Sequence, residues 1–328
     1  MNATLNRWGG MAGTCTRGHT DRLEWSVGTT LPDRSSLEYA LSLESQGLAY
    51  RIAGESLSQE RGQEKPFKHI ESRYDHISYY DTGKKRLLKA DWSPDPLESA
   101  LSQVPKMFRE PEAFRHLLSA VGHHHLPDVS RTAPIKLPQQ MWPARFPGGN
   151  GEDLVSFLYT LRESDRDRYE QIEATLQAAF PEFECLNFPP VAAGMLSMTW
   201  KEALFTQPLY MHQLSDGMIR FLWLVALLHS PTLSTITMID EPEVSLHPEL
   251  LSLLADLLRE ASSRAHIIVA THSDRLVRFL KPEEIVVLDK DEAGLATACW
   301  ADTLDLEAWL AEYSLDEVWR MGRLGGRA

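Results

Sequence analysis

Alternation of hydrophobic and polar positions dominates the first part of the chain. Residues 21 to 55 are rich in such alternation, as in Leu37 to Leu43, and Gly47 then interrupts the pattern. This is typical of a meander or hairpin of strands. Another short strand is expected at Ile77 to Tyr80, and Gly9 to Thr14 is interpreted as a turn.

From about Pro96 the hydrophobic period becomes helical. Apolar residues recur at helical spacing from Leu97 to Met107, and again over 154–161 and 169–180. The prolines and glycines of residues 121 to 150 indicate a loop between these helices. The run His123 to His125 lies in that loop, where we interpret it as solvated rather than as a metal site.

The last third alternates between strands and helices. Strands are expected over 183–188, 195–200, 236–239, 266–270 and 285–288, and leucines at helical spacing from Leu250 to Leu258 predict a helix. A strand, a helix and a strand of these lengths predict parallel pairing, so the strands over 236–239 and 266–270 should end at the same edge of a sheet. Ligands of open α/β sheets bind at that carboxyl edge. Residues Asp289 to Gly294 are interpreted as a hairpin turn.

Composition narrows the class of protein. The 328 residues are 43% hydrophobic, and the net charge is -13. A globular protein with a full core is expected, and the charge gives no global basic footprint, so nucleic acid is possible but unsupported. Cys15, Cys185 and Cys299 are far apart, which favours a reducing cytoplasm. The longest apolar run, Phe221 to Leu228, is too short to span a membrane.

An acidic pair follows the strand over 236–239. Adjacent carboxylates at Asp240 and Glu241 suit two jobs: one holds Mg²⁺, directly or through water, and the other deprotonates an attacking water. The alternative is that the pair caps the following turn.

Two further groups of residues are candidates for contacts with phosphate. Ser215-Asp216-Gly217 precedes an apolar helical run, where free N–H groups can bind a phosphate, although Ser at a helix start is also an ordinary N-cap. His272 follows the strand over 266–270 and can contact a terminal phosphate or the attacking water, although a histidine after a strand is more often a loop residue.

Together these segments resemble three motifs of an ABC-type ATPase. Leu214-Ser215-Asp216-Gly217 resembles the signature, Asp240-Glu241-Pro242-Glu243 with Leu246-His247-Pro248 resembles Walker B, and Ala270-Thr271-His272-Ser273 resembles the switch histidine. The chain is similar to AAA-type members of the ABC/SMC-like ATPases, of the RecF- and OLD-like kind. The likeness is specific over residues 145–328 and faint before them.

The resemblance implies a fold, a set of domains and roles. The fold would be α/β, an ABC-type P-loop NTPase with a parallel central sheet, an antiparallel β subdomain and a helical insertion. The domains would be 1–90, the rest of the N-terminal β-rich part; 91–182, the helical insertion; 183–300, the lobe with the three motifs; and 301–328, a tail.

The cofactors implied are ATP and Mg²⁺. By resemblance, Asp240 serves Mg²⁺, Glu241 is the catalytic base and His272 senses the γ-phosphate. Ser215 and Gly217 contact the γ-phosphate bound by a second protomer, so a homodimer is expected when nucleotide is bound. Asp216 replaces the usual first signature glycine and Met218 the usual glutamine. Gln139 and Gln140 are candidates for a Q-loop residue only as polar loop residues.

The motif G-x-x-x-x-G-K-[ST] of a phosphate loop does not occur in the sequence. In its single Gly-Lys pair, Gly83-Lys84, the next residue is Lys85, and Ser78 stands at the first glycine position. The first strand and phosphate loop are therefore expected to be missing from these residues, which would impair nucleotide binding.

Three hypotheses remain. The recorded start lies too late in an ATP hydrolase, or the chain is a truncated pseudo-ATPase that acts as a protein-interaction module, or Asp240 and Glu241 serve an unrelated metal enzyme. In-frame codons upstream of Met1 would separate the first two. DNA repair and phage defence are both compatible with the family.

Overall fold

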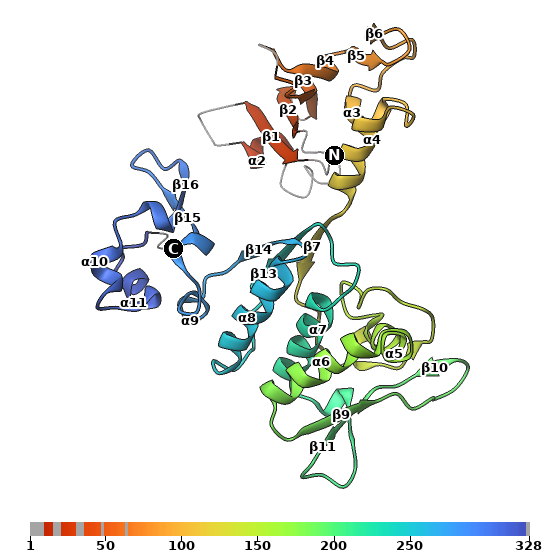
Figure 1. Cartoon of the computed structure of the whole chain (residues 1–328), viewed down its shortest axis with the longest axis vertical. Helices are drawn as coiled ribbons and strands as arrows, with labels where there is room; N and C mark the ends of the chain where they lie inside the picture. Colours follow the sequence, from red (N-terminus) through yellow and green to blue (C-terminus); the bar gives the residue numbers. More distant parts are fainter. Residues whose placement is uncertain (1–9, 16–20, 31–35, 47–48, 63–64, 326–328) are drawn as a thin grey trace. The chain divides into compact units, whose positions relative to one another are not determined.

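The computed structural model describes residues 10–15, 21–30, 36–46, 49–62 and 65–325 (Figure 1). The chain forms two compact units, Met1–Ser119 and Ala120–Ala328. The helical residues expected as one insertion over 91–182 fall in both units.

The first unit contains a six-stranded antiparallel sheet whose strand order follows the sequence. The expected strands of residues 21–55 are confirmed, and the strand near Ile77 is β5. The neighbours of β5, β4 and β6, were not predicted because their polar sequences lack a clear alternation. The strands are β1 (Arg22–Thr30), β2 (Ser36–Gln46), β3 (Ala49–Gln59), β4 (Phe67–Arg73), β5 (His76–Asp81) and β6 (Arg86–Lys89).

Short helices close the core of this unit. These are α2 (Gly10–Thr14), α3 (Ala100–Gln103) and α4 (Arg109–Ser119). The prediction of a turn at Gly9 to Thr14 is wrong for its described part, Gly10–Thr14, which forms one helical turn with Met11 buried; Gly9 lies outside the described residues. The buried Glu55 of β3 accepts hydrogen bonds from Ala100 N at 2.5 Å and Leu101 N at 2.7 Å, so a strand carboxylate caps α3.

Three parallel strands form one of the sheets of the second unit. They are β7 (Val121–His125), β13 (Ile236–Asp240) and β14 (His266–Ala270), in the order β14-β13-β7. The predicted parallel pairing of β13 with β14 is confirmed. The prediction of a loop at His123 to His125 is wrong, because these residues form the end of β7. Hydrogen bonding to β13 makes this polar segment a strand, although its sequence has no hydrophobic alternation that would predict one.

Helices pack against one face of this sheet and continue the core. The helices predicted over 154–161 and 169–180 are confirmed, as is the leucine-rich helix α8. The larger helices are α5 (Leu154–Ser164), α6 (Arg166–Ala179), α7 (Asp216–Leu228) and α8 (Leu250–Ser262).

Smaller elements complete the unit. The strands expected over 183–188 and 195–200 correspond to β9, with β10 and β11. The bounds are β8 (Gln139–Gln140), β9 (Phe183–Asn187), β10 (Met195–Leu196), β11 (Thr199–Glu202), β12 (Leu209–Tyr210), α9 (Asp274–Val277), β15 (Val286–Lys290), β16 (Ala296–Trp300), α10 (Glu307–Leu310), α11 (Leu315–Arg320), and the 3₁₀ turns η1 (Pro134–Lys136), η2 (Met211–Gln213), η3 (Pro282–Glu284) and η4 (Ala301–Thr303). β15 and β16 form the predicted hairpin, with Gly294 in its turn at φ 78°.

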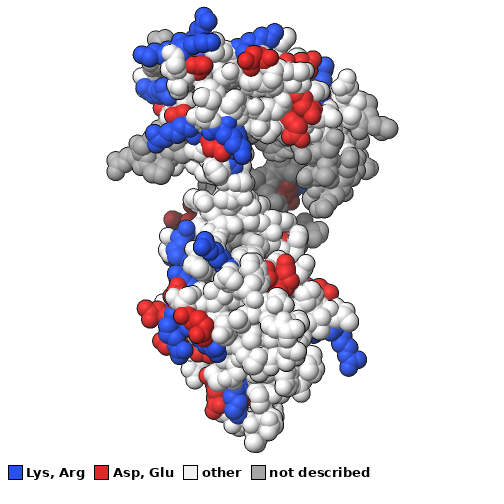
Figure 2. Space-filling model, turned by 90° about the vertical axis from the view of Figure 1, so that its right-hand side faces the viewer, with Lys and Arg blue, Asp and Glu red and all other residues white. Residues whose placement is uncertain are grey.

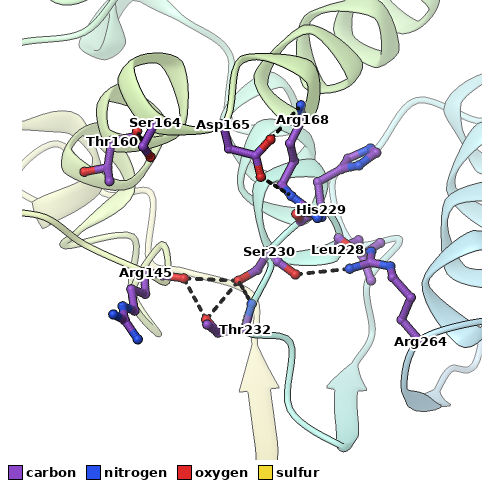
Figure 3. Close-up of polar contacts among 10 residues, drawn as sticks. All are labelled: Arg145, Thr160, Ser164, Asp165, Arg168, Leu228, His229, Ser230, Thr232 and Arg264. Carbon is purple, nitrogen blue, oxygen red and sulfur yellow. Dashed lines mark hydrogen bonds and ion pairs between the residues drawn. The ribbon is translucent and has the colours of Figure 1, made fainter.

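Helix α7 is buried on all sides and fixes the position of the signature segment at its start. Every side chain from Phe221 to Leu228 is at most 1% exposed. At its far end the carbonyl groups are bound by two arginines (Figure 3): Arg264 donates to Leu228 O and Ser230 O, and Arg168 donates to His229 O. Guanidinium groups satisfy carbonyls that a helix end leaves without partners and interact favourably with its dipole.

No helix among the described residues is long and apolar enough to cross a membrane. On the face drawn in Figure 2, basic and acidic side chains are mixed rather than gathered into one basic surface.

Candidate functional site

The carboxyl ends of the three parallel strands bring the predicted site residues together. Asp240, the last residue of β13, pairs with Ala270 of β14 on one side and with His125 of β7 on the other. Glu241 follows directly, and His272 lies just beyond β14. The Nε2 atom of His272 is 3.9 Å from Glu241 Oε1. The sheet therefore places Asp240, Glu241 and His272 at one edge, as the sequence predicts.

The chain turns sharply as it leaves β13. Glu241 has φ 47° and Ser245 has φ 68°, both in the left-handed region that side chains other than glycine seldom adopt. The Glu241 N–H donates to Ala270 O at 2.9 Å, and Val244 N donates to Glu241 O at 3.1 Å. Strained residues of this kind cost about 1–3 kcal/mol each and cluster at functional sites.

Glu243 links the loop after β13 to the loop after β14. Its carboxylate accepts a short hydrogen bond from the Thr271 hydroxyl, and Thr271 Oγ1 accepts from Ser273 N at 3.0 Å. Burial raises the pKa of Glu243, and the neighbouring Glu241 carboxylate raises it further, while the hydrogen bond from Thr271 opposes the rise. One oxygen of Glu243, Oε2, is buried without a hydrogen-bond partner in the described part of the chain.

The donor set at the strand ends fits Mg²⁺. The Asp240 side chain is 44% exposed, so its oxygens are accessible. The described residues contain no group of three or more His, Cys, Asp or Glu that could hold a metal by themselves. Mg²⁺ seldom uses such a cage, because it keeps several waters and is bound by one or two carboxylates together with substrate phosphates.

The signature segment contacts the loop after β13 within the same chain. A Cβ added at Gly217 would lie 2.5 Å from Ser245 O, so only glycine fits there without a shift. Arg220 Nη1 donates to Ser245 Oγ at 2.5 Å. Ser215 caps α7 by accepting from Met218 N at 3.2 Å, and Lys136 Nζ is 3.0 Å from Asp216 Oδ1. Ser215 and Asp216 are exposed.

Sequence reasoning missed His125, whose Nδ1 lies 3.3 Å from Asp240 Oδ2. A run of three histidines shows no alternation of apolar and polar residues and so gives no strand signal, and the position of His125 beside Asp240 could not be found. The two glutamines lie elsewhere. Gln139 is buried and holds the start of α5, since it donates to Gly151 O at 2.6 Å and accepts from Val155 N at 2.8 Å. Gln140 donates to Gly194 O at 3.2 Å.

An apolar groove lies beside β14 and reaches the site. Its volume is about 560 Å³, and its lining includes Val269 and His272 on one side and Val287 on the other. The second edge of β14 pairs with no other described strand. Apolar side chains lie exposed along β14 and β15, with Ile268 50% and Leu288 69% exposed.

A family model described as "AAA domain, putative AbiEii toxin, Type IV TA system" matches residues 5–278. A search of curated proteins finds no match. A solved structure of an SMC head bound to the C-winged helix domain of ScpA is 11% identical, with 92% of this chain and 86% of that chain covered and a TM-score of 0.49. The SMC head domain from Thermotoga maritima is 11% identical, with 80% and 73% covered and a TM-score of 0.34.

The parallel sheet and the match to this model define the chain as an AAA-domain protein. The chain belongs to the AAA-domain family of that model, which spans 84% of its length (274 of 328 residues).

Proposed function

We propose that the protein binds and hydrolyses ATP with Mg²⁺ at the carboxyl edge of the parallel sheet. The observation that carries this proposal is the meeting of Asp240, Glu241 and His272 at neighbouring strand ends, with Nε2 of His272 3.9 Å from Glu241 Oε1. Phosphoryl transfer needs charge neutralisation, an oriented water and positioned phosphates, and little else from the protein.

Each side chain has a distinct role in this proposal. Asp240 holds Mg²⁺, which would neutralise phosphate charge when bound. Glu241, whose side chain is 32% exposed, orients the attacking water and accepts its proton. His272 is 82% exposed and donates to the terminal phosphate.

A further strand and a phosphate loop complete the site. The groove beside β14 supports this, because it is apolar, lies along a strand edge that pairs with no other described strand and opens at His272. An apolar strand inserted there would lie against Ile267 and Val269 and end near His272, with its loop at the phosphates. Because residues 1–328 contain no G-x-x-x-x-G-K-[ST] sequence, we expect these residues alone to bind ATP weakly.

Titration with a fluorescent ATP analogue in Mg²⁺ tests the site. We expect weak binding to residues 1–328 and tight, saturable binding once in-frame upstream codons supply the strand and loop. Asp240→Ala should weaken the tight binding, since the metal then lacks its carboxylate. Low-micromolar binding to residues 1–328 alone that Asp240→Ala abolishes would refute the need for the loop.

The exposed signature segment supports a second proposal, that two copies enclose ATP between them. Ser215 and Gly217 at the start of α7 would meet the γ-phosphate held by the other copy. Analytical ultracentrifugation of the upstream-extended Glu241→Gln protein should then show a dimer with ATP and a monomer without it. Ser215→Arg should block the dimer and spare ATP binding by the monomer. A protein that stays monomeric with ATP bound would contradict the two-copy site, and the signature segment would then serve only to cap α7.

We propose that ATP hydrolysis drives phage defence in the cytoplasm, and we prefer this process to DNA repair. The family description, which names a toxin of a type IV toxin–antitoxin system, supports this order. Phage plating on cells that express the parent or Glu241→Gln protein tests it. Equal plaque numbers on both, and on cells without the protein, would contradict it.

A further inference from the structure

The side chains of the three consecutive histidines of β7 lie in different surroundings. His123 and His125 share one face of the strand, with their ring centres 4.4 Å apart and the rings nearly perpendicular. His124 faces the other way and is 8% exposed, against Phe146 and Trp223. Because side chains alternate along a strand, burial of His124 determines that His125 lies on the open face.

His125 lies beside the carboxylate that ends β13. The two residues are Cα partners in the parallel register, and His125 Nδ1 is 3.3 Å from Asp240 Oδ2. Among the described residues, His125 is the one basic side chain within 4.0 Å of the Asp240 carboxylate. His125 is itself 67% exposed, so its second ring nitrogen is open to solvent.

The register of β7 is fixed on its buried face. A Cβ at Gly122 would lie 2.6 Å from His124 Nε2 and 2.7 Å from Ser234 Oγ, so the strand is packed tightly around His124. A shift of the pairing between β7 and β13 by one residue would place His124 beside Asp240. It would also expose to solvent the apolar side chains that pack against His124. The position of His125 is therefore a property of the packed strand and not of one flexible side chain.

We propose that His125 is a positioning residue for the metal-binding carboxylate of the ATP site; this inference rests on the proposed function. In this role the Nδ1–H of His125 donates a hydrogen bond to Asp240 Oδ2. This fixes the carboxylate and leaves Oδ1 for Mg²⁺. Carboxylates that bind metals are themselves hydrogen-bonded as a rule, and loss of such a partner commonly lowers metal affinity or activity about 10–100-fold.

The tautomer of His125 is the first test. Long-range ¹H–¹⁵N spectra of residues 1–328, with ¹⁵N-labelled histidine and assignment by His125→Asn, should show the proton on Nδ1. In Asp240→Ala the proton should move to Nε2, the position favoured by an unrestrained imidazole in water. A proton on Nε2 in the parent protein would overturn the inference.

Metal affinity is the second test, in the upstream-extended polypeptide. Mn²⁺ binding is measured by electron paramagnetic resonance in the presence of a non-hydrolysable ATP analogue. His125→Ala should weaken Mn²⁺ binding about tenfold, without a matching loss of analogue affinity in the absence of metal. His125→Asn should restore it to within about threefold of the parent, because the amide nitrogen of asparagine can stand where Nδ1 stood. The surface variant His116→Ala is the matched control.

The outcomes separate this inference from the function on which it rests. Parent protein that binds no Mn²⁺ with nucleotide would refute the proposed site and this role with it. Parent protein that binds Mn²⁺, with His125→Ala binding equally well, would refute only the role of His125.

Discussion

Gly217→Ala tests the contact between the signature helix and the loop after β13. The added Cβ would lie 2.5 Å from Ser245 O, where ordinary contacts begin at 3.4 Å, so α7 and the loop must separate by about 0.9 Å. Such overpacking costs about 1–3 kcal/mol. The shift also weakens the bond from Arg220 to Ser245 Oγ, worth about 1 kcal/mol.

Helix propensity acts in the opposite direction. Alanine is favoured over glycine within a helix by about 0.5–1 kcal/mol. The net expectation is a loss of about 1–3 kcal/mol, the overpacking term, because the other two terms are similar in size and opposite in sign. Propensity alone predicts a gain in stability, so the sign of the change decides between the two effects.

Urea unfolding and hydrogen exchange measure this change. The free energy of unfolding should fall, and the first-turn amides of α7 should exchange faster. Gly149→Ala is the control, because a Cβ there meets nothing within 4 Å. Stability of Gly217→Ala equal to or above the parent would refute the steric argument.

Three other predictions concern polar side chains and their hydrogen bonds. Burial lowers the pKa of His69 to about 4. The contribution of His69 to the free energy of unfolding is therefore full above pH 6.5 and is lost as the pH falls toward 4, by on the order of 3 kcal/mol over that window. His69→Gln should flatten the dependence of the unfolding free energy on pH, and an unchanged slope would contradict this. Arg264→Ala removes donors to the carbonyls of Leu228, the last residue of α7, and of Ser230 just beyond it, and should lower the free energy of unfolding by about 1–3 kcal/mol. The control Arg275→Ala should change it by less than about 0.5 kcal/mol. Equal effects of the two variants in urea unfolding would refute the role of Arg264. Thr271→Val leaves Glu243 without its donor and should raise the carboxyl pKa further, which ¹³C-detected titration measures; an unchanged pKa would show that the hydroxyl has no effect.

The strand–helix–strand unit could be predicted because its signals are strong and local. Leu250 to Leu258 form an apolar face at helical spacing, and the strands on either side are apolar. A helix between two strands forces parallel pairing, and this alone places Asp240, Glu241 and His272 at one edge.

The parts that the sequence does not reveal depend on tertiary pairing. β7 is a strand because β13 offers it hydrogen bonds, while its residues Val121 to His125 show no alternation of polarity. The link from Glu243 to Thr271 joins two loops that are far apart in sequence, and no local pattern encodes it. His125 could be recognised as a site residue only from the pairing of β7 with β13.

ATP turnover by the upstream-extended protein tests the central claim most directly. The parent should hydrolyse ATP in Mg²⁺, and Glu241→Gln, which keeps the shape and removes the base, should reduce turnover about 100-fold or more while ATP stays bound. Turnover by Glu241→Gln close to the parent rate would contradict the account, because the catalytic base would then lie outside the strand end at which we place it.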